Sequence, residues 1–152
     1  MRKLYLAILL SGLSMHIFAQ YDLIKQIEKR NCFTVGVLQG GGALIGVDFE
    51  FLLTKQFGFQ LGGGIVGFGG GLNYHFTPSI RSSFVSLQYF NQGIGPSFAQ
   101  NAIGATYVFR GERWLTFQIG LGSPLEKGPA MPDSYKQPSI MLLYSIGVYI
   151  PY

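Results

Sequence analysis

The sequence predicts an all-β fold in which eight antiparallel strands close into an up-and-down barrel. Apolar residues alternate with small or polar ones from residue 32 onward, and turn residues divide this pattern into eight segments. Side chains of a strand point alternately to the two faces of a sheet, so a period of two indicates strands with one apolar face. The 22 glycines add small side chains for the second face.

Residues 1–19 are predicted to be a secretory signal peptide. Arg2 and Lys3 precede an apolar run over 4–13, and 17–19 ends on a small residue before a plausible cleavage site. An N-terminal membrane helix is the alternative, but the apolar run is short for one. Without Arg2 and Lys3, the chain has nine Lys and Arg residues and seven Asp and Glu residues. This small positive charge predicts no nucleic-acid partner.

Residues 20–31 are expected to form a periplasmic N-terminal extension, either a marginal helix or a disordered lead-in, before a barrel domain over 32–152. Leu23, Ile24 and Ile27 have the spacing of one helical stripe. Cys32 is the only cysteine, which excludes an intramolecular disulfide, a Cys-ligated zinc site and a CxxC motif. We expect it to be an inert small residue at a strand start.

Eight segments show the alternation, and the clearest is the second. The segments are 32–39, 44–53, 57–62, 68–76, 84–89, 102–109, 114–121 and 140–152. The connections expected at one end are 54–56, 77–80 and 110–113, and those at the other end are 40–42, 63–67, 91–97 and 122–138. The weak point is the glycine-rich stretch 57–76, since one long bent strand there would leave only seven.

The last segment has one fully apolar face. That face holds every second residue from Ile140 to Tyr152, namely Ile140, Leu142, Tyr144, Ile146, Val148, Ile150 and Tyr152. The other face is smaller and more mixed, with Ser145 and Gly147 at its centre. This parity assigns the apolar face of every other segment.

The second face of the segments indicates a transmembrane barrel. It carries Gly, Ser, Thr, Gln and Asn with few charges, and only 12% of the chain is charged, whereas soluble domains average about 25%. This face is too small and uncharged for a solvated exterior, but it fits a narrow lumen. A closed barrel also pairs its backbone amides, as hydrocarbon requires.

These features together resemble the OmpA/OmpX-type family of small eight-stranded outer-membrane barrels, over residues 32–152. The resemblance implies a place in the outer membrane of a Gram-negative cell envelope, surrounded by lipid. It also implies recognition of the last strand by the barrel-assembly machinery through Tyr144, Val148, Ile150 and Tyr152. Pro151 departs from the pattern because it removes a ladder donor. A periplasmic aromatic girdle is expected from Phe76, Phe109, Tyr149 and Tyr152.

Five polar residues are predicted to form a lumen cluster: Asp48, Glu50, His75, Arg110 and Gln118. Buried carboxylates need partners, and Arg110 has the inward parity to supply one. The alternative is a carboxylate pair for acid/base chemistry or ion binding. His75 with Ser79 or Ser86 also suggests a lipid-modifying enzyme, but the expected topology places His75 away from the outer leaflet. The glycine series lacks the context of a nucleotide-binding loop.

The longest loop, 122–138, is the best candidate for contact with an extracellular partner. Its candidate residues are Glu126, Lys127, Asp133, Tyr135 and Lys136. A solvated loop without a partner is the alternative. Trp114 is expected inward or at the periplasmic rim.

The sequence thus predicts a barrel whose narrow lumen is filled by side chains, since the interior of an eight-stranded barrel is just wide enough for side chains to fill. We expect a structural or surface-interaction role, without catalysis, cofactor or metal. The alternatives are a narrow channel for ions or small solutes, a lipid-modifying enzyme, and a secreted soluble barrel that binds an apolar ligand.

Overall fold

The computed structural model describes residues 29–94 and 96–152, and most of them lie in strands or in turns between strands. The strands are β1 (Asn31–Val37), β2 (Ile45–Leu52), β3 (Phe57–Gly64), β4 (Gly67–His75), β5 (Phe84–Ile94), β6 (Ser97–Arg110), β7 (Leu115–Lys127) and β8 (Met141–Pro151). A four-residue helix, α2 (Gln39–Gly42), lies between β1 and β2. No helix within the described ranges is both long and apolar enough to cross a membrane.

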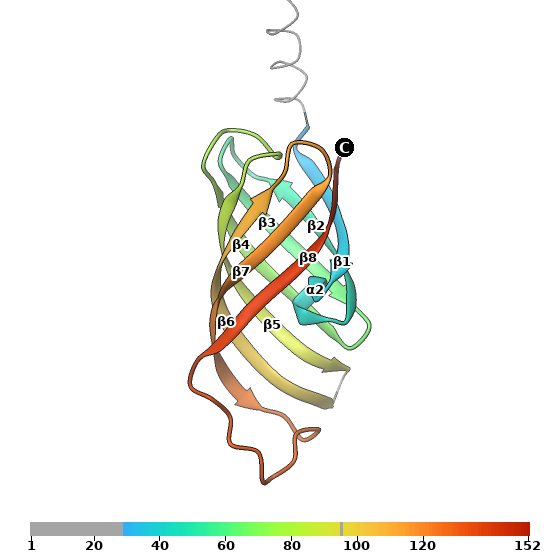
Figure 1. Ribbon diagram of the computed structural model, residues 1–152, viewed down its shortest axis with the longest axis vertical. Helices are drawn as coiled ribbons and strands as arrows, with labels where there is room; N and C mark the ends of the chain where they lie inside the picture. The colour runs from blue at the N-terminus through green and yellow to red at the C-terminus, as the bar shows by residue number, and fades with distance from the viewer. Residues whose placement is uncertain (1–28, 95) are drawn as a thin grey trace, which may run out of the picture.

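The eight strands form one closed antiparallel barrel (Figure 1). Each strand pairs with its neighbour along the chain, and β8 pairs back with β1 from Cys32↔Pro151 to Val37↔Ile146. Closure removes most of the unpaired edge that an open sheet would present. The eight-stranded up-and-down barrel predicted from the sequence is therefore confirmed.

The glycine-rich stretch 57–76 forms two strands. β3 and β4 pair from Phe57↔Tyr74 to Gly64↔Gly67, with residues 65–66 as a tight turn between them. The seven-strand alternative is therefore wrong. Gly63 and Gly64 belong to β3 itself, not to the loop expected over 63–67.

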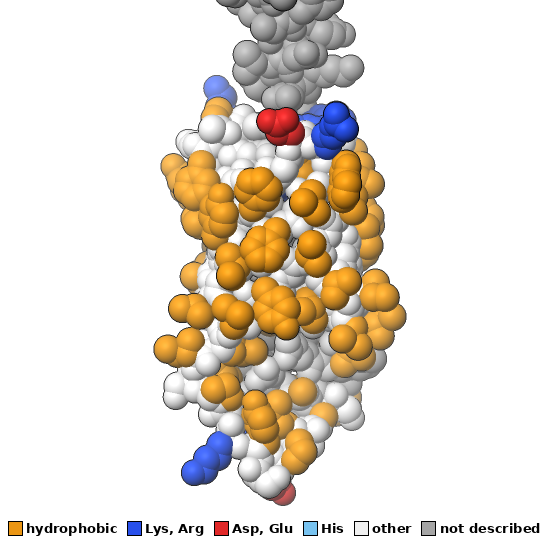
Figure 2. Space-filling model, in the orientation of Figure 1, with side chains coloured by type: hydrophobic (Ala, Val, Ile, Leu, Met, Phe, Trp, Pro, Cys, Tyr) orange, Lys and Arg blue, Asp and Glu red, His pale blue; other side chains and the backbone are white. Residues whose placement is uncertain are grey.

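The two faces of the barrel wall differ in chemistry. The outer face is apolar on every strand, as Figure 2 shows for one side of the molecule. Most of the buried polar side chains line the lumen, including Thr34, Glu50, Gln60, Asn73, His75, Ser86, Gln88, Thr106, Arg110, Thr116, Gln118 and Ser145. The barrel is thus inverted relative to a soluble one, in which the apolar face points inward.

The two ends of the barrel differ in their connections. One end, which we call the terminal end, holds Asn31 and Tyr152 and the turns 53–56, 76–83 and 111–114. The other, the loop end, holds the connections 38–44, 65–66 and 128–140 and the link between β5 and β6. The strands β1 to β4 have 7 to 9 residues, whereas β5 to β8 have 11 to 14. The second half of the barrel therefore extends further at the loop end (Figure 1).

Several boundaries differ from the sequence-based expectation. β7 continues to Lys127, so the longest loop is 128–140 and not 122–138. Leu44, expected as the first residue of the second segment, precedes β2 and is exposed, because the chain is still turning there. Trp114 is exposed in the turn 111–114, which is the rim position. The predicted leader 1–19 and most of the extension 20–31 lie outside the described residues.

Candidate functional site

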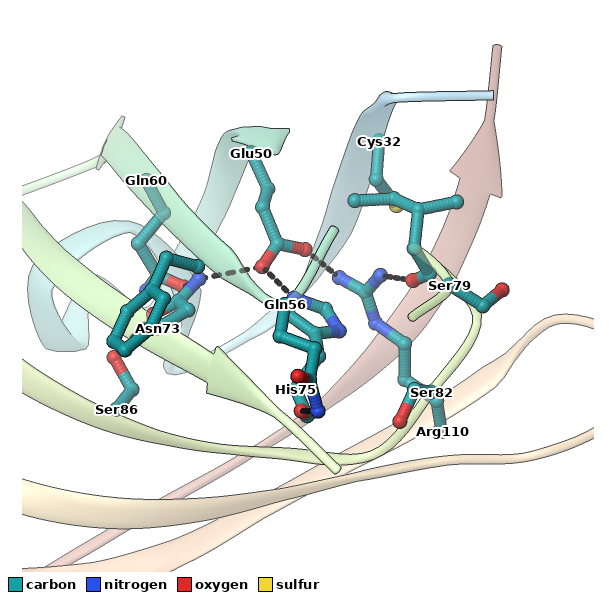
Figure 3. Close-up of polar contacts among 12 residues, drawn as sticks. Cys32, Glu50, Gln56, Gln60, Asn73, His75, Ser79, Ser82, Ser86 and Arg110 are labelled. Carbon is teal, nitrogen blue, oxygen red and sulfur yellow. Dashed lines mark hydrogen bonds and ion pairs between the residues drawn. The ribbon is translucent and has the colours of Figure 1, made fainter. Parts of the chain in front are cut away.

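Glu50 is the centre of a buried polar cluster at the terminal end of the lumen, and only 2% of this residue is exposed. Its carboxylate accepts hydrogen bonds from Arg110 Nη2 at 2.5 Å, from His75 Nε2 at 2.9 Å and from Asn73 Nδ2 at 2.5 Å (Figure 3). Glu50 lies on β2, His75 and Asn73 on β4, and Arg110 on β6, so the cluster ties three strands together across the lumen. A buried carboxylate is stable only with such partners.

Arg110 is held on several sides at once. Its Nη1 donates to the backbone carbonyl of Ile80, which the turn 76–83 places inside the barrel mouth. Its guanidinium carbon lies 5.0 Å from the ring centroid of Phe84 and 4.8 Å from that of Tyr149. Aromatic faces attract a guanidinium, so these rings stabilise the charge while they keep water away.

A small apolar cluster closes the terminal end of the lumen around this charge network. It consists of Cys32, Leu52, Ile80 and Tyr149, and the hydroxyl of Tyr149 donates to the carbonyl of Gly111. Tyr149 is only 1% exposed, so its predicted place in an aromatic girdle is wrong. Its odd parity on β8 turns it inward, whereas Phe76, Phe109 and Tyr152 are exposed.

The network continues from Asn73 to Gln60 and Ser86. Asn73 Nδ2 also donates to Gln60 Oε1 at 2.8 Å, and Ser86 Oγ donates to Asn73 Oδ1 at 2.5 Å. Ser79 Oγ accepts from the backbone N–H of Arg81 at 3.2 Å. Among the described residues neither serine bonds to His75, which is fully buried. The arrangement fits a cross-link between strands and does not assemble a nucleophile with a base.

Gln118 lies deeper in the lumen, away from the Glu50 cluster. Its Nε2 donates to Gln88 Oε1 at 2.8 Å, and its Oε1 accepts from Ser145 Oγ at 3.4 Å. These contacts connect β5, β7 and β8 at mid-height. Of the five residues expected in one lumen cluster, the structure brings Glu50, His75 and Arg110 together and places Gln118 in this second layer.

Asp48 belongs to a third layer of the lumen. This layer is made by a segment whose inward position was not predicted from the sequence. Residues 38–43, expected as an outward loop around 40–42, instead fold into the lumen, where α2 lies against β2, β3, β4, β5 and β8 (Figure 1). Asp48 Oδ2 accepts the backbone N–H of Gly40 at 3.1 Å. The two carboxylates on β2, Asp48 and Glu50, therefore serve different partners and do not form an acid/base pair.

The glycine-rich walls of β2 to β4 make room for this inserted segment. A Cβ atom at Gly62 would overlap Asp48 Oδ1 and lie 2.8 Å from the Cα of Gly40, and one at Gly69 would lie 2.9 Å from the Cα of Gly41. Gly40 and Gly41 themselves have φ angles of 62° and 82°, which favour glycine. The signal in the sequence was the match between the glycines at 40–42 and those at 62–64 and 69–71.

These three layers fill most of the lumen. At mid-height the described residues leave two small cavities, each of about 10 Å³, and both are lined by Gln39, Asp48, Gln60 and Gln118. A cavity of this size holds about one water molecule.

The residues expected to contact an extracellular partner divide into two groups. Glu126 and Lys127 lie on β7, where Glu126 Oε2 accepts from Asn101 Nδ2 at 2.9 Å. Lys127 Nζ donates to the backbone carbonyls of Pro132 at 2.8 Å and Tyr135 at 3.2 Å, so it organises the loop 128–140 from its base. Asp133, Tyr135 and Lys136 are exposed on that loop. The residues expected as an assembly signal, Tyr144, Val148, Ile150 and Tyr152, lie along the outer side of β8 and beyond its end.

The described part of the chain contains no group of three or more His, Cys, Asp or Glu side chains placed to hold a metal ion. The fold and its interior define a class: a closed eight-stranded antiparallel barrel with an apolar exterior and a polar, filled lumen. Comparisons with protein-family models, curated proteins and solved structures found no match to this chain.

Proposed function

We propose that this chain is an integral outer-membrane β-barrel with a filled lumen and a structural or surface-interaction role. The carrying observation is the apolar belt on the outer face of all eight strands. Soluble monomers rarely expose contiguous apolar patches larger than a few hundred Å². In a bilayer the same surface would be covered by hydrocarbon chains, with the strand amides paired by barrel closure.

The distribution of charge supports a membrane-spanning belt. In the described part of the chain, Lys29, Arg30, Lys55, Arg81, Glu112 and Arg113 lie at the terminal end, and Glu126, Lys127, Asp133 and Lys136 lie at the loop end. The other charged side chains, Asp48, Glu50 and Arg110, face the lumen. We place the terminal end in the periplasm because the longest connection, 128–140, lies at the other end, as in barrels of this type.

The filled lumen supports a structural role over the alternative of a channel. Glu50 and Arg110 seal one end with Tyr149, and the inserted segment 38–43 lies across the lumen toward the other. The first layer is held by hydrogen bonds between strands, and the second by the bond from Gly40 N–H to Asp48, so opening either would leave a carboxylate in the lumen without a donor. The polar lumen also argues against an apolar ligand at the barrel centre, as a secreted soluble barrel would hold.

Refolding into lipid vesicles tests the membrane assignment. We expect the urea-denatured chain to fold only when vesicles or detergent micelles are added, and to migrate faster in unheated than in heated samples on detergent gels. A chain that folds to a monodisperse, soluble barrel in buffer without amphiphile would overturn the proposal.

Conductance in planar bilayers separates the filled barrel from a narrow channel. Reconstituted protein should show no steady current steps, because the two small cavities at mid-height of the lumen hold about one water each. Reproducible single-channel openings would instead favour transport of ions or small solutes.

Two surfaces follow from this placement. The outer side of β8, with Tyr144, Val148 and Ile150, is the surface we propose for the barrel-assembly machinery during insertion, by resemblance to OmpA/OmpX-type barrels. The exposed part of the loop 128–140, with Asp133, Tyr135 and Lys136, is the surface we propose for contacts outside the cell.

A further inference from the structure

The barrel wall is incomplete at the loop end between β1 and β8. β1 ends at Val37, which pairs with Ile146, but β8 begins earlier, at Met141. Within the described chain, no strand pairs with the β1 side of residues 141–145. After Val37 the chain leaves the wall at Leu38, whose φ of 58° turns it into the lumen.

A cavity of about 160 Å³ lies at this gap. Its lining includes Leu38 and Gly42 of the inserted segment, the inward-facing Phe90 and Leu143, and the outward-facing Tyr144. Four consecutive residues of β8, Met141 to Tyr144, line the cavity, so it lies along the strand edge that β1 leaves unpaired. A cavity of about 150 Å³ is large enough to bind benzene, so this one suits a group of similar size.

The inner end of the cavity carries hydrogen-bonding groups. Gln92 and Gln118 contribute amides to its lining, and Gln118 bonds to Gln88. Gln88 is 3% exposed, and its Nε2 has no hydrogen-bond partner among residues 29–94 and 96–152. Gln88 lines the adjoining small cavity, which shares Leu38, Phe90 and Gln118 with the larger one. An unpaired buried donor is costly, so a ligand oxygen at this point would stabilise the site.

The surface around the gap is apolar. The neighbouring connections 38–44 and 65–66 contain no charged residue, and Leu44, Ile65 and Val66 are exposed. On the longer strands the apolar belt ends at a hydrogen-bonded row, Asn91, Asn101 and Glu126. No comparable polar row ends the belt on β1 to β4, so the surface beside the gap suits lipid better than water.

We propose that this gap is a lateral entrance to a binding cavity for a small amphipathic molecule, with an apolar group of about benzene size and a hydroxyl or carbonyl oxygen. The apolar group lies against Leu38, Phe90 and Leu143, and the oxygen accepts from the amide layer of Gln88 and Gln118. The proposal rests on the proposed membrane location, because the molecule reaches the gap by partitioning from the outer leaflet.

Methyl NMR of the full chain in lipid nanodiscs tests the proposal, with benzyl alcohol as the probe. Met141 lines the cavity, whereas Met131 lies in the loop 128–140 and serves as the internal control. We expect a saturable shift of the Met141 methyl resonance and little change at Met131. Equal, linear shifts at both methionines would show partitioning alone and overturn the proposal.

Two variants make the test specific. Leu143→Trp should fill the cavity and raise the apparent Kd at least tenfold, whereas Leu121→Trp on the outer face should leave it unchanged. Gln88→Leu should abolish the preference for benzyl alcohol over toluene, and a preference that survives would overturn the assigned donor layer. Because Leu143→Trp can also impair folding, heat-modifiable migration is recorded for each variant.

A separate measurement tests whether the cavity opens toward the lipid. Lipids with a nitroxide on the acyl chain should broaden the Met141 resonance, and broadening only by a water-soluble relaxation agent would overturn the lateral entrance. A chain that inserts and is heat-modifiable but binds no probe contradicts this inference alone. A chain that never inserts contradicts the proposed function instead.

Discussion

Glu50 shows how this barrel carries charge inside a narrow lumen. Its carboxylate has three side-chain donors, and its cationic partner Arg110 lies against Phe84 and Tyr149. The pairing of Glu50 with Arg110 followed from sequence parity, because both have inward positions. The contribution of Tyr149 did not, because an aromatic residue near a strand end suits a girdle as well as a lumen.

Removing the charge of Glu50 should destabilise the barrel strongly. Glu50→Gln leaves the guanidinium of Arg110 buried without a counter-ion, and breaking such a pair costs about 3–5 kcal/mol. The free energy of unfolding in vesicles can be followed in urea through Trp114, the one tryptophan of the chain.

Two variants control this measurement. Glu126→Gln, at an exposed position, should change the free energy of unfolding by no more than about 0.5 kcal/mol. The double variant Glu50→Gln with Arg110→Met should recover part of the loss. If it is as unstable as the sum of the single variants, the two side chains do not act as a pair.

Of two adjacent glycines on β3, one should be sensitive to substitution and the other should tolerate it. Gly62→Val places a side chain against Asp48 and Gly40, so we expect a loss of about 1–3 kcal/mol from overpacking. Gly63→Val meets only ordinary contacts, the nearest at 3.8 Å, and should be tolerated. Equal urea midpoints for the two variants would contradict the inward placement of residues 38–43.

At the scale of elements, the period-two pattern was sufficient to locate all eight strands. It underestimated β5 to β7 because their loop ends carry amides and glycine, which break the apolar alternation although the backbone stays paired. It could not place residues 38–43, because their position depends on glycines far away in the sequence. Alternation reports which face a residue occupies, but not whether a loop folds inward.

Lys127 is expected to control the order of the loop 128–140. Lys127→Met removes donors to the carbonyls of Pro132 and Tyr135, and a typical intramolecular hydrogen bond contributes about 0.5–1.5 kcal/mol. Chymotrypsin should therefore cleave after Tyr135 several-fold faster in intact vesicle-embedded protein. Lys136→Met, next to the same bond but exposed, should have a much smaller effect; equal acceleration by both would refute the role of Lys127.

For the molecule as a whole, the stability cost of a charged substitution on the outer face should depend on its depth in the bilayer. Leu121→Arg lies on the belt between Ala105 and Leu142, and an arginine near the bilayer midplane costs about 2–4 kcal/mol. Leu125→Arg, beside Glu126 at the end of the belt, should cost about 0–1 kcal/mol. Equal urea stability of the two variants in vesicles would mean that the belt is not in lipid.

The class of the molecule was predictable because the inner face is small and nearly uncharged, which a solvated exterior cannot be. The sequence could not predict the gap beside β8, since it arises from the unequal lengths of β1 and β8. The ends of strands depend on pairing with neighbouring strands. The period-two pattern of the sequence therefore carries little information about where a strand stops.

Cell fractionation tests the membrane location most directly. In a Gram-negative host that expresses the full chain, the protein should sediment with the outer membrane, resist extraction by alkali and urea, and be released by detergent in a heat-modifiable form. Recovery of the folded barrel in the soluble periplasmic fraction, or its release by alkali alone, would contradict the proposed membrane location.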